Sequence, residues 1–158
     1  MDANGNSEAQ SGYGTGFFLK RGNAAWFEID EVTSVPMAEQ SADEYEVTHF
    51  KSPKKKKEWR TGLTDDGEGT LEINYIPGSK TDTELRAARA SGEVCEYETY
   101  LPAPGGKWLK ISGFLIVKSR GRAVPINNRM TQSVTVRFTG DDAEVVAASQ
   151  RVLAPVAP

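Results

Sequence analysis

The segment Glu31–Leu63 reads EVTSVPMAEQSADEYEVTHFKSPKKKKEWRTGL and lies between two runs that have the composition of β-strands. Pro36 interrupts it, a mostly polar stretch follows, and a Ser-Pro pair then precedes four consecutive lysines. Connections longer than about 12–15 residues without regular structure of their own are uncommon in compact domains, and they are usually functional or mobile. We therefore expect residues 36–57 to form an extended loop, too long for a hairpin turn and too polar for the core.

The chain before this segment indicates a flexible arm followed by a hairpin. Residues 1–16 contain four glycines and almost no apolar side chains, so they cannot bury enough surface to offset the entropy of ordering. Residues 17–21 and 25–32 are rich in aromatic and β-branched side chains, and Gly22-Asn23 between them tolerates positive φ. We expect the arm and the 36–57 loop to become ordered only when a partner covers them.

The chain after the segment alternates strand signals with one helix signal. Residues 58–61 predict a short strand, and residues 69–76 predict a strand with period-2 alternation. Thr81 and Glu84 match the capping-box pattern, so a helix of about ten residues should begin there and end at Ser91-Gly92.

Further strands are expected at 93–101, 108–119 and 132–139, with a basic linker at 120–129. Residues 141–158 predict either another strand or an irregular C-terminal segment. The predicted fold is mainly β: a single sandwich or barrel domain over residues 17–140, with one flanking α-helix, a long inter-strand loop and flexible termini. The expected core comprises Leu71, Ile73, Leu85, Leu109, Ile111, Leu115, Val134, Val136 and Phe138.

Composition excludes several classes of function. A net charge of −3 and a pI near 5.3 argue against a protein that grips a nucleic acid backbone. One cysteine, Cys95, and one histidine, His49, provide neither a disulfide nor a four-ligand zinc site, so we expect no metal or other cofactor. No apolar run approaches the ~20 residues that span a bilayer, and no signal peptide is recognisable, so we expect no membrane contact and a cytoplasmic origin.

Enzymatic activity is not expected. His49 has no serine or cysteine partner in a recognisable motif, and we interpret it as a hydrogen-bonding residue at a strand end. Pro104-Gly105-Gly106-Lys107 lacks the spacing and the following helix of a phosphate-binding loop, so it predicts a turn.

Two charged groups have more than one interpretation. Lys54, Lys55, Lys56 and Lys57 are either a solvated loop face, a contact for an acidic patch on a neighbouring copy, or a nucleic acid contact. The acidic strand residues are either ordinary solvent-facing positions or the wall of a channel. They are Glu28, Asp30, Glu72, Glu96 and Glu98.

The pattern resembles the major tail tube protein of long, non-contractile-tailed (siphovirus-type) bacteriophages. The resemblance rests on Thr33–Pro36, Asp43–His49, Ser52-Pro53 and Gly62-Leu63, and it continues weakly through Gly67-Glu68 and the turn at Asn74–Gly78. It covers most of the chain after residue 16. It implies a structural virion protein that polymerises into stacked hexameric rings around a hollow lumen.

The resemblance also implies partners and an interface. The partners would be further copies of the chain and the tail tip (initiator), tape measure and tail terminator proteins, with DNA passing through the lumen unbound. Assembly would take place in the host cytoplasm, and the protein would reside in the virion tail. The 36–57 loop would supply the contacts between subunits or rings, through Asp43, Glu44, Tyr45, Val47, His49, Phe50, Lys54, Lys55, Lys56 and Lys57.

Two alternatives remain at this point. The first is the Hcp-like secretion-tube component of a bacterial injection system, which has a similar fold but a different cargo. The second is a monomeric immunoglobulin-like binding module. The pattern at Asp43–His49 and Ser52-Pro53 favours the phage protein over the secretion tube.

Overall fold

The computed structural model describes residues 3–4 and 7–153, and its described part is mostly β-sheet. One α-helix lies in this part, α1 (Lys80–Ser91), together with a short 3-10 turn, η1 (Pro53–Lys55). The strands are β1 (Gly16–Arg21), β2 (Phe27–Glu28), β3 (Val32–Ser34), β4 (Ser41–Glu46), β5 (Trp59–Asp65), β6 (Glu68–Asn74), β7 (Cys95–Ala103), β8 (Lys107–Ala123) and β9 (Thr131–Ala147).

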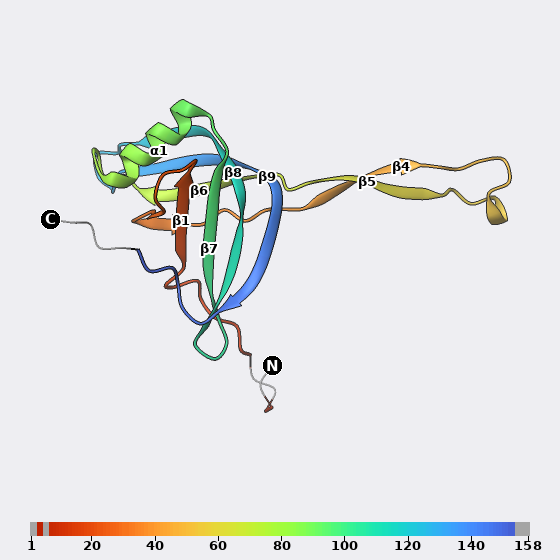
Figure 1. The fold of residues 1–158 in the computed structure, drawn as a ribbon, viewed down its shortest axis with the longest axis horizontal. Helices are drawn as coiled ribbons and strands as arrows, with labels where there is room; N and C mark the ends of the chain where they lie inside the picture. Colours follow the sequence, from red (N-terminus) through yellow and green to blue (C-terminus); the bar gives the residue numbers. More distant parts are fainter. Residues whose placement is uncertain (1–2, 5–6, 154–158) are drawn as a thin grey trace.

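Seven strands form one antiparallel sheet in the order β2-β1-β7-β8-β9-β6-β3. The sheet curls into a half-barrel, and α1 packs across one end of its concave side (Figure 1). This confirms the predicted mainly-β class with one flanking helix. The basic segment predicted as a linker belongs partly to β8, which continues to Ala123, and the C-terminal segment begins as the second half of β9.

The curl is concentrated where β8 and β9 change register. Their pairing shifts between Ser112 and Phe114, and Gly140 on β9 has a φ of 73° that side chains disfavour. Beside the shift, the ring of Tyr97 lies over Gly113, where an added Cβ would come within 3.2 Å of Tyr97 Cε1 and 3.4 Å of the Asp141 carbonyl oxygen. A side chain at residue 113 would have to displace these neighbours by a few tenths of an ångström, which favours glycine beside the register shift.

The core lies between the concave face and α1. All the predicted core residues are buried except Leu109, which is partly buried and packs against the cluster. Aromatic side chains that the prediction had not included also contribute. Phe17, Phe27 and Tyr97 join the core, and Tyr97 contacts both Phe17 and Phe138.

The helix begins two residues earlier than predicted. Ser79, not Thr81, is the N-cap, and its hydroxyl accepts a hydrogen bond from the Asp82 N–H at 3.2 Å. The Thr81 hydroxyl instead accepts from the Asp30 N–H and ties the helix to the segment after β2. The C-terminal end is as expected, with Gly92 in the left-handed conformation at φ 63°.

The prediction that residues 36–57 form a loop without regular structure is wrong. Residues 41–65 form a two-stranded antiparallel ribbon of β4 and β5, with Ser41 opposite Asp65 and Glu46 opposite Trp59. The short strand predicted at 58–61 is part of β5. The polarity of the segment concealed the pairing, because a strand that faces water on both sides shows no apolar alternation. The expectation that it lies outside the core is correct for the ribbon, since every residue of β4 and β5 is exposed, but Pro36 is buried and Ala38 packs against the core.

Replacing Ile111 by alanine tests the core assignment. Ile111 is 6% exposed on the concave side of β8, so the truncation should lower the free energy of unfolding by about 2–5 kcal/mol. Ile126→Ala is the matched control, because Ile126 is 98% exposed and the same truncation should change stability by less than about 0.5 kcal/mol. Chemical denaturation measures both. Equal stability of the two variants would contradict the assigned orientation of β8.

Candidate assembly surfaces

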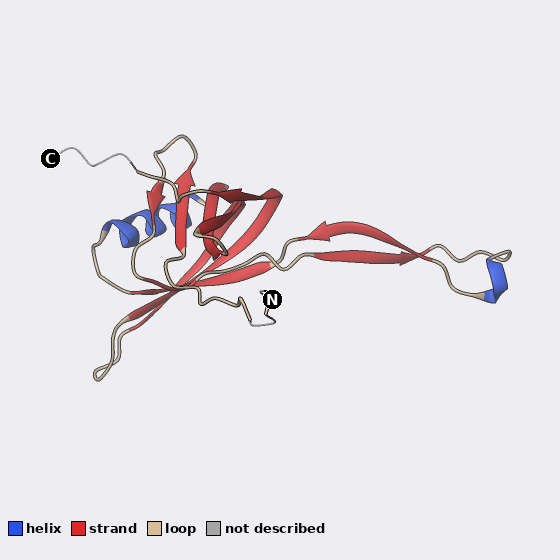
Figure 2. Cartoon of the chain, turned by 90° about the horizontal axis from the view of Figure 1, so that it is seen from below, coloured by secondary structure: helices blue, strands red, loops and turns tan. Residues whose placement is uncertain are grey.

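The ribbon (residues 41–65) projects away from the half-barrel along the long axis of the molecule (Figures 1 and 2). It is anchored at its base, where the Glu39 N–H donates to the Asp66 carbonyl at 3.1 Å and the Phe138 N–H donates to the Gly67 carbonyl. An isolated two-stranded hairpin is marginally stable in water. We therefore expect the ribbon to be stably ordered only when another molecule packs on it.

Apolar side chains are exposed on the ribbon. Tyr45 and Trp59 are about half exposed, Leu63 is 84% exposed, and Phe50 at the tip is fully exposed. The two ribbon faces differ: Tyr45 lies opposite Arg60, whereas Glu46 lies opposite Trp59. Exposed apolar groups on a projecting ribbon are typical of a protein interaction site.

The tip is held by a local hydrogen-bond network. The Ser52 hydroxyl accepts from the His49 N–H and donates to the Glu58 carboxylate, while the Thr48 hydroxyl accepts from the Glu58 N–H. His49 Nδ1 accepts from the Lys51 N–H at 3.2 Å. The interpretation of His49 as a hydrogen-bonding strand-end residue is confirmed.

The other predicted interface residues are distributed along the ribbon. Asp43 and Glu44 lie on β4 near its base, and half-buried Val47 joins the strands to the tip through a hydrogen bond with Glu58. Lys54, Lys55 and Lys56 are exposed at the tip. Lys57 lies 3.6 Å from Glu46 and 6.0 Å from the ring centroid of Trp59, so only part of the lysine run is unpaired.

One long edge of the sheet is open. Up to Arg137, β9 is paired on both sides, with β6 and β8, but from Thr139 to Ala147 the described strands pair with it on the β8 side alone. Val145 and Val146 on this stretch are exposed. Such an edge presents a row of unpaired backbone groups to any other strand. The signal for this surface in the sequence is weak, because adjacent valines do not alternate with polar residues.

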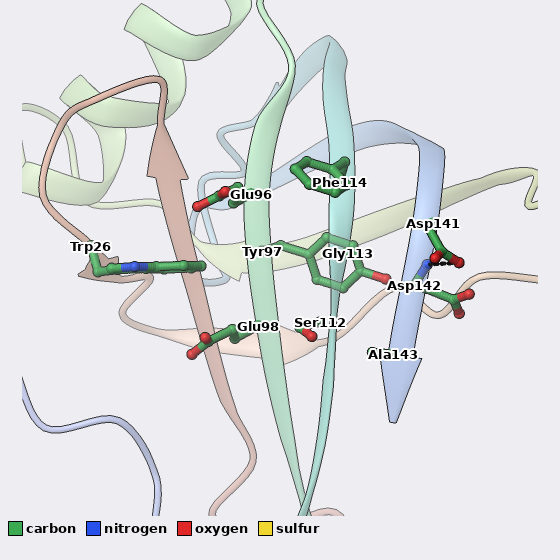
Figure 3. Close-up of a pocket in the computed structure, with 10 residues that line it drawn as sticks. All are labelled: Trp26, Glu96, Tyr97, Glu98, Ser112, Gly113, Phe114, Asp141, Asp142 and Ala143. Atoms are coloured by element: carbon green, nitrogen blue, oxygen red, sulfur yellow. Dashed lines mark hydrogen bonds between the residues drawn. The ribbon is translucent and has the colours of Figure 1, made fainter. Parts of the chain in front are cut away.

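The sheet face away from α1 is called the outer face and is defined by the cross-strand partners Phe18, Glu98 and Ser112. The register places Glu28, Glu72 and Glu96 on this face, the first two of them exposed. Figure 3 shows Glu96, Glu98 and Trp26 on the same side of β7, around a pocket of about 350 Å³. Partial burial and the nearby Asp30 raise the pKa of Glu28.

The other two acidic residues, Asp30 and Glu98, have different surroundings. Asp30 lies beside the N-terminus of α1, in a pocket with Ser79 and Thr81. Glu98 is only 4% exposed, and its carboxylate accepts hydrogen bonds from Arg151 at 2.8 and 2.6 Å and from the Tyr100 hydroxyl at 2.9 Å. Lys110 Nζ lies 3.3 Å from the same carboxylate.

These contacts fasten the segment after β9 to the outer face. The Arg151 guanidinium also lies 4.4 Å from the ring centroid of Trp26, and Gln150 Nε2 donates to the Gly14 carbonyl at 2.7 Å. Burial alone would raise the pKa of Glu98, but the hydrogen bonds from Arg151, Tyr100 and Lys110 outweigh it and lower the pKa to about 2. Sequence reasoning missed this contact because 53 residues separate Glu98 from Arg151.

Metal-ligand clusters and membrane-spanning helices are absent from the part of the chain that the structure describes. The described residues contain no group of three or more His, Cys, Asp or Glu residues placed to hold a metal ion. In the same part of the chain, no helix has the length and apolar character needed to cross a membrane. The only cysteine, Cys95, is buried, and burial raises the pKa of its thiol to about 11, which leaves it unreactive.

The chain that folds into this half-barrel and ribbon matches a known family over most of its length. The family model described as lambda phage tail tube protein, TTP, matches residues 10–145. The chain belongs to this family. It is a structural component of a siphovirus-type tail tube and is located in the virion tail. The resemblance seen in the sequence is thereby confirmed, whereas a search of curated protein sequences finds no match.

Solved structures share the fold. The tail of an empty gene transfer agent (GTA) particle, refined with C6 symmetry, is similar with a TM-score of 0.67 and 19% identity, over 87% of this chain and 99% of that one. The SPP1 tail tube has a TM-score of 0.53 and 14% identity, over 85% and 77%. The anti-feeding prophage baseplate has a TM-score of 0.66 and 10% identity, over 92% and 99%. These are structures of multi-chain particles, which agrees with self-assembly of the family into tubes.

Replacing Arg151 by alanine tests the fastening of the C-terminal segment. Since two hydrogen bonds to a buried carboxylate are lost, the free energy of unfolding at pH 7 should fall by about 2–3 kcal/mol. The folded-state pKa of Glu98 lies below its ordinary 4.5, so its contribution is present above that pH and is lost as the pH falls toward 2.

The difference in free energy of unfolding between the unmodified protein and Arg151→Ala should therefore shrink as the pH falls from 5 to 3. Urea unfolding at several pH values measures this difference. Lys57→Ala is a control that removes a surface ion pair with Glu46 and should cost less than about 1 kcal/mol. A cost for Arg151→Ala that stays constant down to pH 3 would show that Glu98 is not its partner.

Proposed function

We propose that this chain forms hexameric rings that stack into the hollow tail tube, and that phage DNA passes through the lumen during ejection. The observation that carries the proposal is an open half-barrel beside a fully exposed ribbon, because neither surface is satisfied within one copy. The C6 symmetry of the similar GTA tail supports six copies per ring. Tail tip, tape measure and terminator proteins would then be the partners at the two ends and in the lumen, with assembly in the host cytoplasm.

Ring closure would use the free edge of β9 from Thr139 to Ala147. At the other edge of the sheet, β2 is two residues long and leaves most of β1 without a regular neighbouring strand. Pairing of one copy's β9 edge with the opposite edge of the next copy would join the half-barrels into one barrel. Closure in this way removes the unpaired edges that otherwise promote uncontrolled association.

Ring stacking would use the ribbon. It reaches beyond the half-barrel and exposes both charged and apolar side chains, so it can contact a copy in the next ring (Figure 1). Exposed ion pairs contribute only about 0–1 kcal/mol each. The apolar residues Tyr45, Val47 and Phe50 would therefore provide much of the contact, while the charges of the ribbon set its register and its salt sensitivity.

The outer face would line the lumen, because it lies opposite the face that α1 covers. Glu28, Glu72 and Glu96 would give this wall carboxylates that repel the phosphate backbone. Lys20 is only 3.3 Å from Glu96, and Lys118 pairs with Glu68, so the basic residues of this face are partly neutralised. DNA would then slide without adhering.

Excising the ribbon tests its assembly role. Ser41 and Asp65 are cross-strand partners, so residues 42–64 can be replaced by a short Gly-Ser turn without moving the chain ends. The shortened protein should keep the thermal unfolding temperature of the full chain, because the removed strands are exposed, but it should form no tubes in negative-stain electron microscopy. Tubes of normal length from this variant would refute the role of the ribbon, and a protein that fails to fold would assign it to the domain core.

Reversing the charge of Glu28 and Glu72 tests the lumen. Tubes of the unmodified chain should not retain short duplex DNA in co-sedimentation at 150 mM salt, whereas tubes of Glu28→Lys/Glu72→Lys should retain it, because the wall would then attract phosphate. Glu93→Lys is the matched control, since Glu93 follows the C-cap of α1 and its reversal should not retain DNA. Equal retention by the control would place the attraction outside the lumen.

The fold alone does not separate this function from secretion through an injection-system tube, since the anti-feeding prophage baseplate has a similar fold. Both would give tubes in the microscope. The match to the phage family model favours DNA as the cargo.

A further inference from the structure

The turn between β8 and β9 is a second projecting element that the tube proposal leaves without a role. It comprises residues 120–130, the end of β8 and the residues before β9, and it lies at the end of the molecule away from the ribbon (light blue at the left of Figure 1). Residues 118–140 contain no aspartate or glutamate. The turn is therefore purely basic and stands out in a chain with a net charge of −3.

The three arginines of the turn differ in their contacts. Arg120 is neutralised by Asp82 at 2.8 Å. Arg122 donates to the Tyr75 hydroxyl at 3.2 Å and lies 5.6 Å from its ring centroid, which orients the guanidinium without an ion pair to any described carboxylate. Arg129 has no acidic partner among the described residues. Val124 and Ile126 between them are 68% and 98% exposed.

The base of the ribbon has the complementary composition. Residues 22–50 contain no lysine or arginine, and the acidic residues Glu39, Asp43 and Glu44 lie on or just before β4. Asp43 and Glu44 have no cationic partner among the residues that the structure describes. Leu63 on the paired strand is 84% exposed and Tyr45 is about half exposed. This surface therefore offers uncompensated carboxylates beside apolar groups, as the turn offers uncompensated arginines beside apolar groups.

The positions of the two elements suit end-to-end contact between copies. They lie at opposite ends of the longest dimension of the molecule, so one copy cannot bring its own turn to its own ribbon (Figures 1 and 2). A contact between different surfaces on two copies leaves each copy with one free surface of each kind, and it therefore continues as a filament.

We propose that the basic β8–β9 turn of one copy docks on the acidic base of the ribbon of a copy in the adjacent ring. Arg122 and Arg129 would face Asp43 and Glu44, and Ile126 would pack beside Leu63. This contact rests on the proposed function and names the surface that the ribbon meets. A second copy fits better than a nucleic acid, because the turn exposes apolar Val124 and Ile126 between its arginines, and the base of the ribbon offers both carboxylates and apolar side chains.

Charge reversal with a compensating swap tests the contact. The measured quantity is the concentration of unassembled full-length protein in equilibrium with tubes, obtained by sedimentation at 150 mM salt with negative-stain microscopy. Arg129→Glu should raise this concentration at least about tenfold, because it puts like charges together at each ring junction. Glu44→Lys or Asp43→Lys in the same chain should bring it back toward the unmodified value. Ile126→Ser should also raise it, without changing the salt dependence.

The controls distinguish this contact from general effects. Lys107→Glu makes the same charge change in the exposed β7–β8 turn and should leave the concentration unchanged. Thermal unfolding of the monomer should not change for Arg129→Glu, because its side chain is exposed and has no acidic partner among the described residues.

Three outcomes would overturn the inference: normal assembly of Arg129→Glu, no restoration by either swap, or an equal defect in Lys107→Glu. A variant Arg129→Glu that assembles normally but loses affinity for short duplex DNA would assign the turn to nucleic acid instead. Absence of tubes from the unmodified chain would contradict the proposed function itself. Failure of this inference alone would instead appear as tubes from the unmodified chain that Arg129→Glu does not weaken.

Discussion

The pairing of β8 with β9 is the constraint on which the rest of the structure depends. Each strand has 17 residues, and their ladder joins residues 108–123 to 131–147 through the connection at residues 124–130. All other strands of the sheet attach to one side or the other of this pair. Its bend, at the register shift beside Gly113 and Gly140, makes the sheet a half-barrel and so creates the concave side that α1 covers. A flat sheet would have offered α1 no enclosed core.

The same pair also explains why the molecule is incomplete alone. Because β9 is longer than β6, its second half extends past its neighbour and leaves a free edge with exposed valines. At its other end the pair extends past α1 as the basic turn. An open edge, a basic turn and the ribbon are three unsatisfied surfaces that point in different directions. This arrangement fits a subunit that gains its final stability from neighbouring copies rather than from its own core.

The charged side chains of the molecule form two groups, buried carboxylates that join elements of the fold and charges that remain exposed. Asp82, 1% exposed, accepts hydrogen bonds from the Gly78 N–H, Arg86 and Arg120, and so joins the helix N-terminus to the end of β8. Glu98 joins the C-terminal segment to the outer face through Arg151. Both are buried carboxylates with more than one donor, which is the condition under which a buried charge is tolerated. The charges of the ribbon and the β8–β9 turn, in contrast, are exposed and therefore available to another molecule.

Local periodicity and backbone preference, read from the sequence, predicted the mainly-β class, the strands with alternating side chains and the end of the helix at Gly92. The sequence also placed residues 36–57 outside the core, which holds for the ribbon, and its motifs indicated the family. Only the tertiary structure decided that this segment is a paired ribbon, since a strand exposed on both faces has no apolar signal. Only the folded chain shows that Arg151 contacts Glu98, that β9 has a free edge, and that the β8–β9 turn lies at the opposite end of the molecule from the ribbon. Those features depend on contacts and distances between residues far apart in the chain, which no local pattern records.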